Sequence, residues 1–144
     1  MKKTFKRILA GAMACALTIG ISATAVAISP MVVFYLPGYS RVIGSVSYKT
    51  YGSNNVVFTA TSRSTDGRAI PKLYAGVIVT DIVTGNKIYQ TYSKGYDKNS
   101  YSISTYGMTQ KPMTATGKHN ARNAQGKFAL EEDASTFIVF DPDE

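Results

Sequence analysis

The chain has 144 residues, a formal net charge of +7 at pH 7, one cysteine and one histidine. This length fits one ordinary domain whose hydrophobic core can be stable alone. A single cysteine excludes a framework of intrachain disulfides. With only one cysteine and one histidine, a structural zinc site is not expected, because such a site usually takes three or four cysteine or histidine ligands.

The first predicted element is a leader over residues 1–27. An apolar run at 8–21 is followed by small residues, with alanines at 23, 25 and 27. This run is shorter than the roughly 20 residues that span a bilayer, which argues against an uncleaved anchor. We therefore predict a helical secretory signal peptide, cleaved after Ala27 or, as a second choice, after Ala25. Its positive start is formed by Lys2, Lys3, Lys6 and Arg7.

Cleavage would change both the cysteine content and the charge of the chain. Cys15 lies inside the apolar run rather than at its end, as a lipid-modified cysteine would, so the exported chain has no cysteine. Loss of the four leader cations lowers the formal charge from +7 to +3. We expect a secreted protein, extracellular or associated with the cell envelope, and periplasmic in a Gram-negative source. No transmembrane segment remains after cleavage.

Seven or eight short strands are predicted after the leader, with turn residues between them. Residues 41–51 and 56–63 alternate apolar and polar side chains, as half-buried strands do. Residues 73–84 are the most apolar segment, so we expect them to form a central strand and a hairpin with residues 87–93. Residues 128–134 fit either one helical turn or an irregular strand. The expected strands are residues 32–36, 41–51, 56–63, 73–84, 87–93, 100–106, 113–119 and 136–140.

These elements predict an all-β fold. The β-branched residues and tyrosines suit pleated, half-buried surfaces, and no segment after the leader shows a sustained helical repeat. We expect residues 28–144 to form one domain, an antiparallel two-sheet sandwich of Ig-like architecture. Its C-terminal end is acidic, because residues 131–144 hold six acids and no base, while residues 28–130 hold twelve bases and three acids.

Few residues are available for catalysis. Before residue 131 the acids are only Asp66, Asp81 and Asp97, whereas glycoside hydrolysis takes a pair of carboxylates. His119 has no acid within ten residues to orient it in a serine triad. We therefore expect a protein that is not an enzyme, with no catalytic residue, no metal site and no cofactor. Asp81 lies in the apolar strand, and we expect it to face outward as a rim charge.

Two interpretations stay open for residues 114–127, which hold the only histidine among cations and no acid. In the first, a strand ends at His119 and residues 120–126 form a polar loop. In the second, Lys118, His119, Arg122 and Lys127 converge on a phosphate or carboxylate. An anionic polymer of the cell envelope has that chemistry, whereas a charge of only +3 makes nucleic acid an unlikely partner.

The tyrosines, which all lie between residues 35 and 106, also allow two interpretations. Alternation in the strand after residue 86 places Tyr89 on one face and Tyr92 with Tyr96 on the other. Exposed rings stack on sugars, so these three tyrosines are candidates for a carbohydrate site. In the other interpretation most of the rings are buried and leave their hydroxyls at the rim of the sheet.

In size, export and polar aromatic strands, the chain resembles small, cysteine-free secreted β-sandwich bacteriocins such as lactococcin 972. It departs from them in having no tryptophan, which that family uses. The expected function is that of an exported, non-enzymatic β-sandwich that binds an extracellular or envelope ligand. The alternatives are a bacteriocin-like or toxin-like secreted protein, and a structural or accessory component of an envelope assembly.

Overall fold

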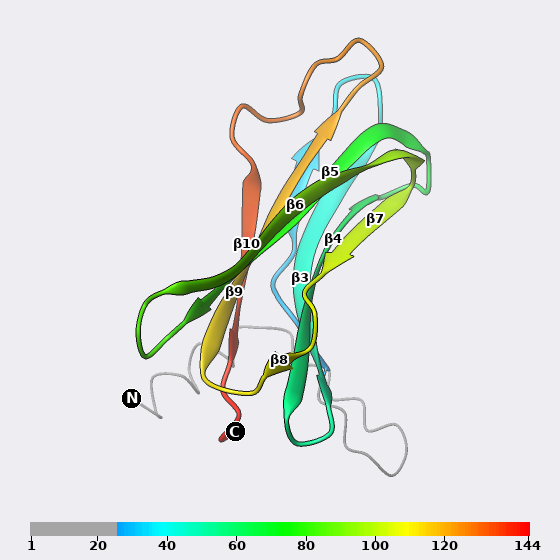
Figure 1. Ribbon diagram of the computed structural model, residues 1–144. Coiled ribbons are helices and arrows are strands. Elements are labelled where there is room, and N and C mark those ends of the chain that lie inside the picture. The colour runs from blue at the N-terminus through cyan, green and yellow to red at the C-terminus, as the bar shows by residue number, and fades with distance from the viewer. Residues whose placement is uncertain (1–25) are drawn as a thin grey trace.

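Strands form all the regular structure of residues 26–144, which are the residues that the computed structural model describes, and no helix occurs among them (Figure 1). This confirms the predicted all-β class. The predicted helical leader lies outside the described residues except for its last two, Val26 and Ala27. These two belong to a short strand, β1 (Val26–Ile28), which pairs with residues 47–49.

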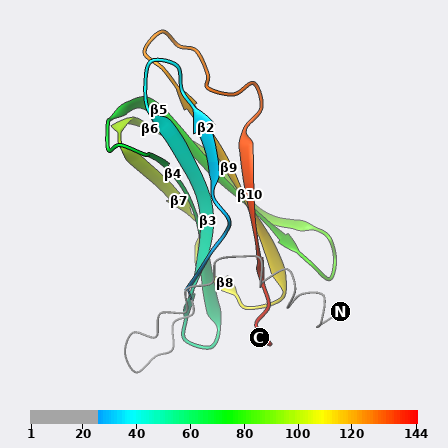
Figure 2. The ribbon, with the colours of Figure 1, turned by 180° about the vertical axis from the view of Figure 1, so that it is seen from behind.

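The strands form two antiparallel sheets (Figures 1 and 2). The first sheet has the order β1, β3 (Arg41–Tyr51), β4 (Asn55–Ser64) and β7 (Ser100–Ser104). Two short strands join it, because β2 (Val32–Tyr35) pairs with β3 and β8 (Met108–Thr109) pairs with β4. The second sheet has the order β10 (Ala134–Phe140), β9 (Met113–Arg122), β5 (Ile70–Asp81) and β6 (Lys87–Lys98). The ten strands exceed the predicted seven or eight by β1 and β8, which are too short to show alternation.

The two sheets pack face to face through the apolar side chains of their alternating strands. Val46 of β3 and Phe58 of β4 share one buried cluster with Val77 of β5, Ala115 of β9 and Ile138 of β10. Each valine or phenylalanine of this kind contributes about 1.5–3 kcal/mol on burial. Residues 41–51 and 56–63 therefore alternate between core and surface, as their sequence pattern predicted.

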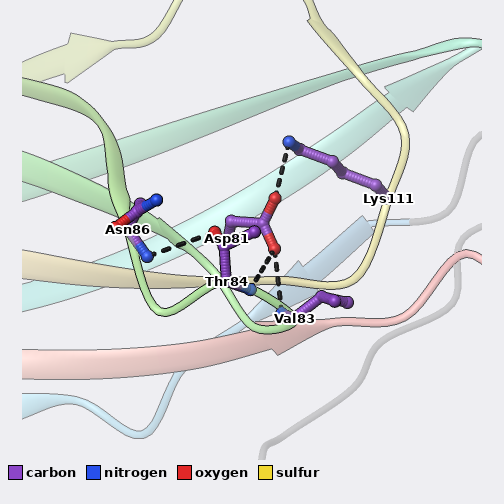
Figure 3. Close-up of polar contacts among 5 residues, drawn as sticks. All are labelled: Asp81, Val83, Thr84, Asn86 and Lys111. Carbon is purple, nitrogen blue, oxygen red and sulfur yellow. Dashed lines mark hydrogen bonds and ion pairs between the residues drawn. The ribbon is translucent and has the colours of Figure 1, made fainter.

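The strand β5 is central and forms a hairpin with β6, as predicted, and its second neighbour is β9. It begins and ends earlier than expected. Pro71 is its second residue, a position near the start of a strand where a missing N–H is tolerated. The strand ends at Asp81 because this carboxylate accepts hydrogen bonds from the N–H groups of Val83 (2.8 Å) and Thr84 (3.2 Å), which turns the chain (Figure 3). Residues 82–84, predicted as strand, therefore belong to the turn.

Asp81 also corrects a prediction about its surroundings. Asp81 is only 7% exposed, so the prediction that it faces outward as a rim charge is wrong. Lys111 donates to the second carboxylate oxygen at 2.7 Å (Figure 3). This hydrogen bond, with those from the turn, lowers the pKa of Asp81 and compensates the charge for its loss of water.

The strand β9 continues three residues beyond its predicted end. Residues 119–122 pair with β5, where His119 lies opposite Ala75 and Arg122 opposite Lys72, while β10 pairs with residues 113–119 on the other side. The polar sequence here is loop-like, but pairing with β5 keeps residues 120–122 in the strand. Residues 129–133 then form bends rather than a helical turn, and β10 begins at Ala134, two residues before its predicted start.

Candidate functional site

The register of the second sheet brings together Tyr92, Tyr96, Lys118 and Arg122. Gly76 of β5 lies opposite Tyr92 on one side and Lys118 on the other, and Lys72 lies in the same way between Tyr96 and Arg122. Residues directly opposite each other point to the same face of a sheet. The neighbouring residues of β5, such as Ala75 and Val77, are in the core, so this face is the outer one.

The other predicted site residues lie elsewhere. Tyr89 packs against the core cluster, and its ring meets that of Tyr106 edge to face at 5.1 Å. Lys127 is exposed in the loop that follows β9, and Arg122 holds this loop through a hydrogen bond from its Nε to the carbonyl of Gly126. His119 points into the core, opposite to Lys118, so the four residues of the predicted anion cradle do not converge.

His119 is fully buried and bridges the two sheets. Ser62 of β4 donates its hydroxyl hydrogen to the carbonyl of Tyr74 (2.7 Å), so Nδ1 of His119 must donate to Ser62 Oγ (3.0 Å). Nε2 then carries no hydrogen and accepts from the hydroxyl of Thr136 (2.8 Å). Burial lowers the pKa of His119 to about 4, although the charge of Asp133 acts in the opposite direction. The prediction that a strand ends at His119 is also wrong, because β9 continues to Arg122.

The outer face of the second sheet holds a groove of about 590 Å³. Ile78 of β5 and Lys118 of β9 form its floor. Tyr92 and its neighbours in β6 form one wall, and the segment before β10 forms the other. Such a volume lies in the range of small-ligand sites. The lining residues are Ile78, Gln90, Thr91, Tyr92, Lys118, Glu131, Glu132 and Asp133.

The ring of Tyr92 is held from three sides. A Cβ added at Gly76 would lie 2.5 Å from Tyr92 Cδ2, so the ring occupies the space that the glycine leaves. The ring stacks on Tyr74 with a centroid distance of 5.8 Å and an interplanar angle of 22°. Its hydroxyl donates to Oδ1 of Asp133 at 3.3 Å. Burial and then the charge of Asp133 raise the pKa of Tyr92, which keeps the hydroxyl a donor.

The opposite wall is held by Asn120, which is only 2% exposed. Its Nδ2 donates to the carbonyl of Leu130 (3.1 Å) and to Oδ1 of Asp133 (2.9 Å), while its Oδ1 accepts from the N–H of Leu130 (3.3 Å). Asp133 Oδ1 thus joins this wall to Tyr92. The sequence interpretation missed Asn120 because it assigned residues 120–126 to a loop. The small inward residues Gly117 and Ala121 continue the alternation and could have shown the longer strand.

Charge is divided along the outer face. Near the groove, three carboxylates of residues 131–133 face one cation, Lys118, whose Nζ donates to Ser135 Oγ at 2.8 Å. Toward the other end, three cations lie over aromatic rings. Lys72 is 5.5 Å from the Tyr96 centroid, Lys94 is 5.9 Å from Tyr74 and from Tyr96, and Arg122 is 5.2 Å from Phe128.

Comparison with known proteins gives no family assignment, because no protein-family model and no curated protein matches the chain. Within residues 26–144, no group of three or more histidine, cysteine or acidic side chains is placed to hold a metal ion. The same residues contain no helix long and apolar enough to cross a membrane.

Proposed function

We propose that this chain is an exported, non-enzymatic binding protein whose groove takes a carbohydrate of an extracellular or cell-envelope surface. The observation that carries this proposal is the groove beside Tyr92, in which an exposed aromatic ring is surrounded by hydrogen-bonding side chains. A sugar ring presents an apolar C–H face to an aromatic ring and hydroxyl groups to polar side chains around it. Gln90 and the carboxylates of residues 131–133 supply such donors and acceptors.

The groove favours a carbohydrate over the anionic polymer that the sequence also suggested. Three carboxylates and one ammonium group leave it with an excess of negative charge, which repels phosphate and carboxylate ligands. The only histidine supports a non-enzymatic role, because both of its ring nitrogens are engaged in the core by Ser62 and Thr136.

We further propose that residues 28–144 form a single Ig-like β-sandwich domain. The order β3-β4-β7 resembles strands A-B-E of that architecture, and β10-β9-β5-β6 resembles G-F-C-C′. Chain order agrees as well, since the chain changes sheets between β4 and β5, between β6 and β7, and between β8 and β9. The groove then lies on the outer face of the G-F-C-C′ sheet.

Export rests on the signal-peptide pattern of residues 1–27, and the location outside the cytoplasm follows from it. The pairing of β1 adds one consideration. Cleavage after Ala27 leaves only Ile28 of this strand, while cleavage after Ala25 leaves all of it. The second choice therefore keeps the buried side chain of Ala27 in the core.

Binding of the secreted chain to purified envelope and extracellular polysaccharides tests the function. Tyr92→Ala should weaken binding about 10-fold, which is the size of one lost aromatic contact with its neighbouring polar contacts. Tyr35→Ala is the matched control, because Tyr35 is similarly exposed but lies in β2 of the other sheet. Equal effects of the two substitutions, or no binding to any polysaccharide, would contradict the proposal.

A role in an envelope assembly is the second candidate. The observation that favours it is a group of exposed apolar side chains in and beside β2, with Met31, Val33 and Tyr35 exposed by 51%, 54% and 61%. Apolar residues exposed together are typical of interaction surfaces. Replacement of Val33 by Ser should then reduce co-purification with envelope fractions while leaving sugar binding unchanged. The bacteriocin-like alternative stays a prediction from the sequence.

A further inference from the structure

We propose that the groove selects sugars that carry a free, protonated amino group over their acylated or anionic counterparts. This proposal rests on the carbohydrate function and specifies its ligand. It begins from the rings of the outer face. Tyr74, Tyr96 and Phe128 each have a lysine or arginine of the protein over them. Within residues 26–144, two exposed rings of this face have no such cation, Tyr92 (45% exposed) and Phe137 of β10 (49% exposed).

Of these two rings, Tyr92 is the one that lines the groove beside the carboxylates. Tyr74 covers one face of Tyr92, so the other face is available to a ligand in the groove. An ammonium group within about 6 Å of a ring centroid is attracted by the electrons of the ring. The phenol hydroxyl donates to the Asp133 carboxylate, which polarises the O–H bond and increases the electron density of the phenol oxygen and its ring.

Carboxylate oxygens remain to accept hydrogen bonds from that ammonium group. Oδ1 of Asp133 is occupied by Tyr92 and Asn120, which fixes the side chain and leaves Oδ2 as an acceptor. Glu131 and Glu132 are exposed and, within the described part of the chain, have no hydrogen bond or ion pair. Hydrogen bonds between an ammonium group and a carboxylate are about twice as strong as neutral ones.

Lys118 is the one cation that opposes this ligand, and its position limits the effect. Its Nζ donates to Ser135 Oγ on the β10 side of the floor, away from β6. Three carboxylates against one ammonium leave the groove negative, so a second ammonium group lowers the electrostatic energy of the site. A phosphate or carboxylate on the sugar raises it.

A pair of oligosaccharides that differ only in acylation gives the test. Tetramers of β-1,4-linked glucosamine and of β-1,4-linked N-acetylglucosamine would be titrated into the secreted chain by calorimetry at pH 6, above the ordinary range of carboxyl pKa values. We expect the glucosamine tetramer to bind about 10-fold more tightly, and high salt to reduce this difference. Tyr92→Ala should weaken binding of both tetramers.

The double variant Glu131→Gln/Glu132→Gln should remove the preference for the amine. Its matched control is Asp141→Asn/Asp143→Asn, which changes the net charge equally at carboxylates outside the groove. Tyr92-dependent binding with no preference for glucosamine would overturn the amine specificity and leave the carbohydrate function standing. If both double variants abolish the preference equally, the preference comes from net charge, and the amine specificity of the groove is overturned. If neither tetramer binds, the amine specificity is overturned. The carbohydrate function would then be tested by the binding of other polysaccharides alone.

Discussion

The burial of His119 makes the stability of the protein depend on pH in a defined range. Its imidazole is 0% exposed and is neutral, with a hydrogen on Nδ1 and none on Nε2. Protonation of Nε2 would place a positive charge in the core, with only the carboxylate of Asp133 near enough to favour it. In the unfolded chain the same ring is in water and binds a proton freely near pH 6.5.

The magnitude follows from the pKa of His119, which is about 4 in the folded chain and ordinarily 6.5. Because the folded value is the lower one, the stabilisation is complete above pH 6.5 and is lost as the pH falls toward 4. Each pKa unit corresponds to 1.36 kcal/mol, so the total loss is about 3 kcal/mol. A hydrogen bond from the Arg68 N–H holds the pKa of Asp66 below 3.8, and one from Lys111 does the same for Asp81. The stability that these two carboxylates contribute is therefore lost only at lower pH.

Urea unfolding of residues 26–144, followed by tyrosine fluorescence between pH 7 and 4, measures this loss. The midpoint should fall steadily below pH 6.5 in the wild type. His119→Gln, which retains a donor and an acceptor, removes the only histidine in the chain and should remove that slope, whatever its stability at pH 7. A wild type whose stability is constant over this range, or a variant with an unchanged slope, would refute the buried neutral imidazole.

Three further predictions concern packing, the turn after β5 and export. Gly44→Ala should destabilise the protein by about 1–3 kcal/mol in thermal melts, because its Cβ would lie 2.3 Å from the buried imidazole. The control is Gly107→Ala, whose Cβ would have no neighbour closer than 3.8 Å. Asp81→Ala should lower the melting temperature more than Asp81→Asn, because the amide oxygen can still accept both turn N–H bonds, and the reverse order would contradict the assigned role. N-terminal sequencing of secreted material should find Ile28 first, or Val26 as second choice, and recovery of the intact leader on membranes would contradict export.

The parts of the fold that the sequence predicted best are those whose alternation is set by the core alone. Val46 and Phe58 belong to long strands with one apolar face, so a shift by one residue would expose the whole face, and their inward direction could be predicted. The end of β9 is marked more weakly in the sequence, by the small inward residues Gly117 and Ala121 alone. Its residues 120–122 become strand because β5, which is distant in sequence, pairs with them.

The candidate site shows the same division. Tyr92 and Lys118 were each proposed as ligand residues from local pattern, but their common face depends on the register of three strands. The groove wall was missed because Glu131 and Asp133 looked like the beginning of an acidic tail. Contacts between residues that no local pattern connects, above all those of Asn120 with Leu130 and Asp133, hold that segment over the sheet.

The missing side chain at position 76 gives protein engineers a means of altering the groove without touching its lining. Gly76 contributes no lining atom, yet the ring of Tyr92 rests in the space above it. Alanine, serine and valine at this position would displace the ring of Tyr92 by increasing amounts. The width of the groove beside the ring would change with that displacement. Libraries that vary ligand size would therefore begin at a residue that never meets the ligand.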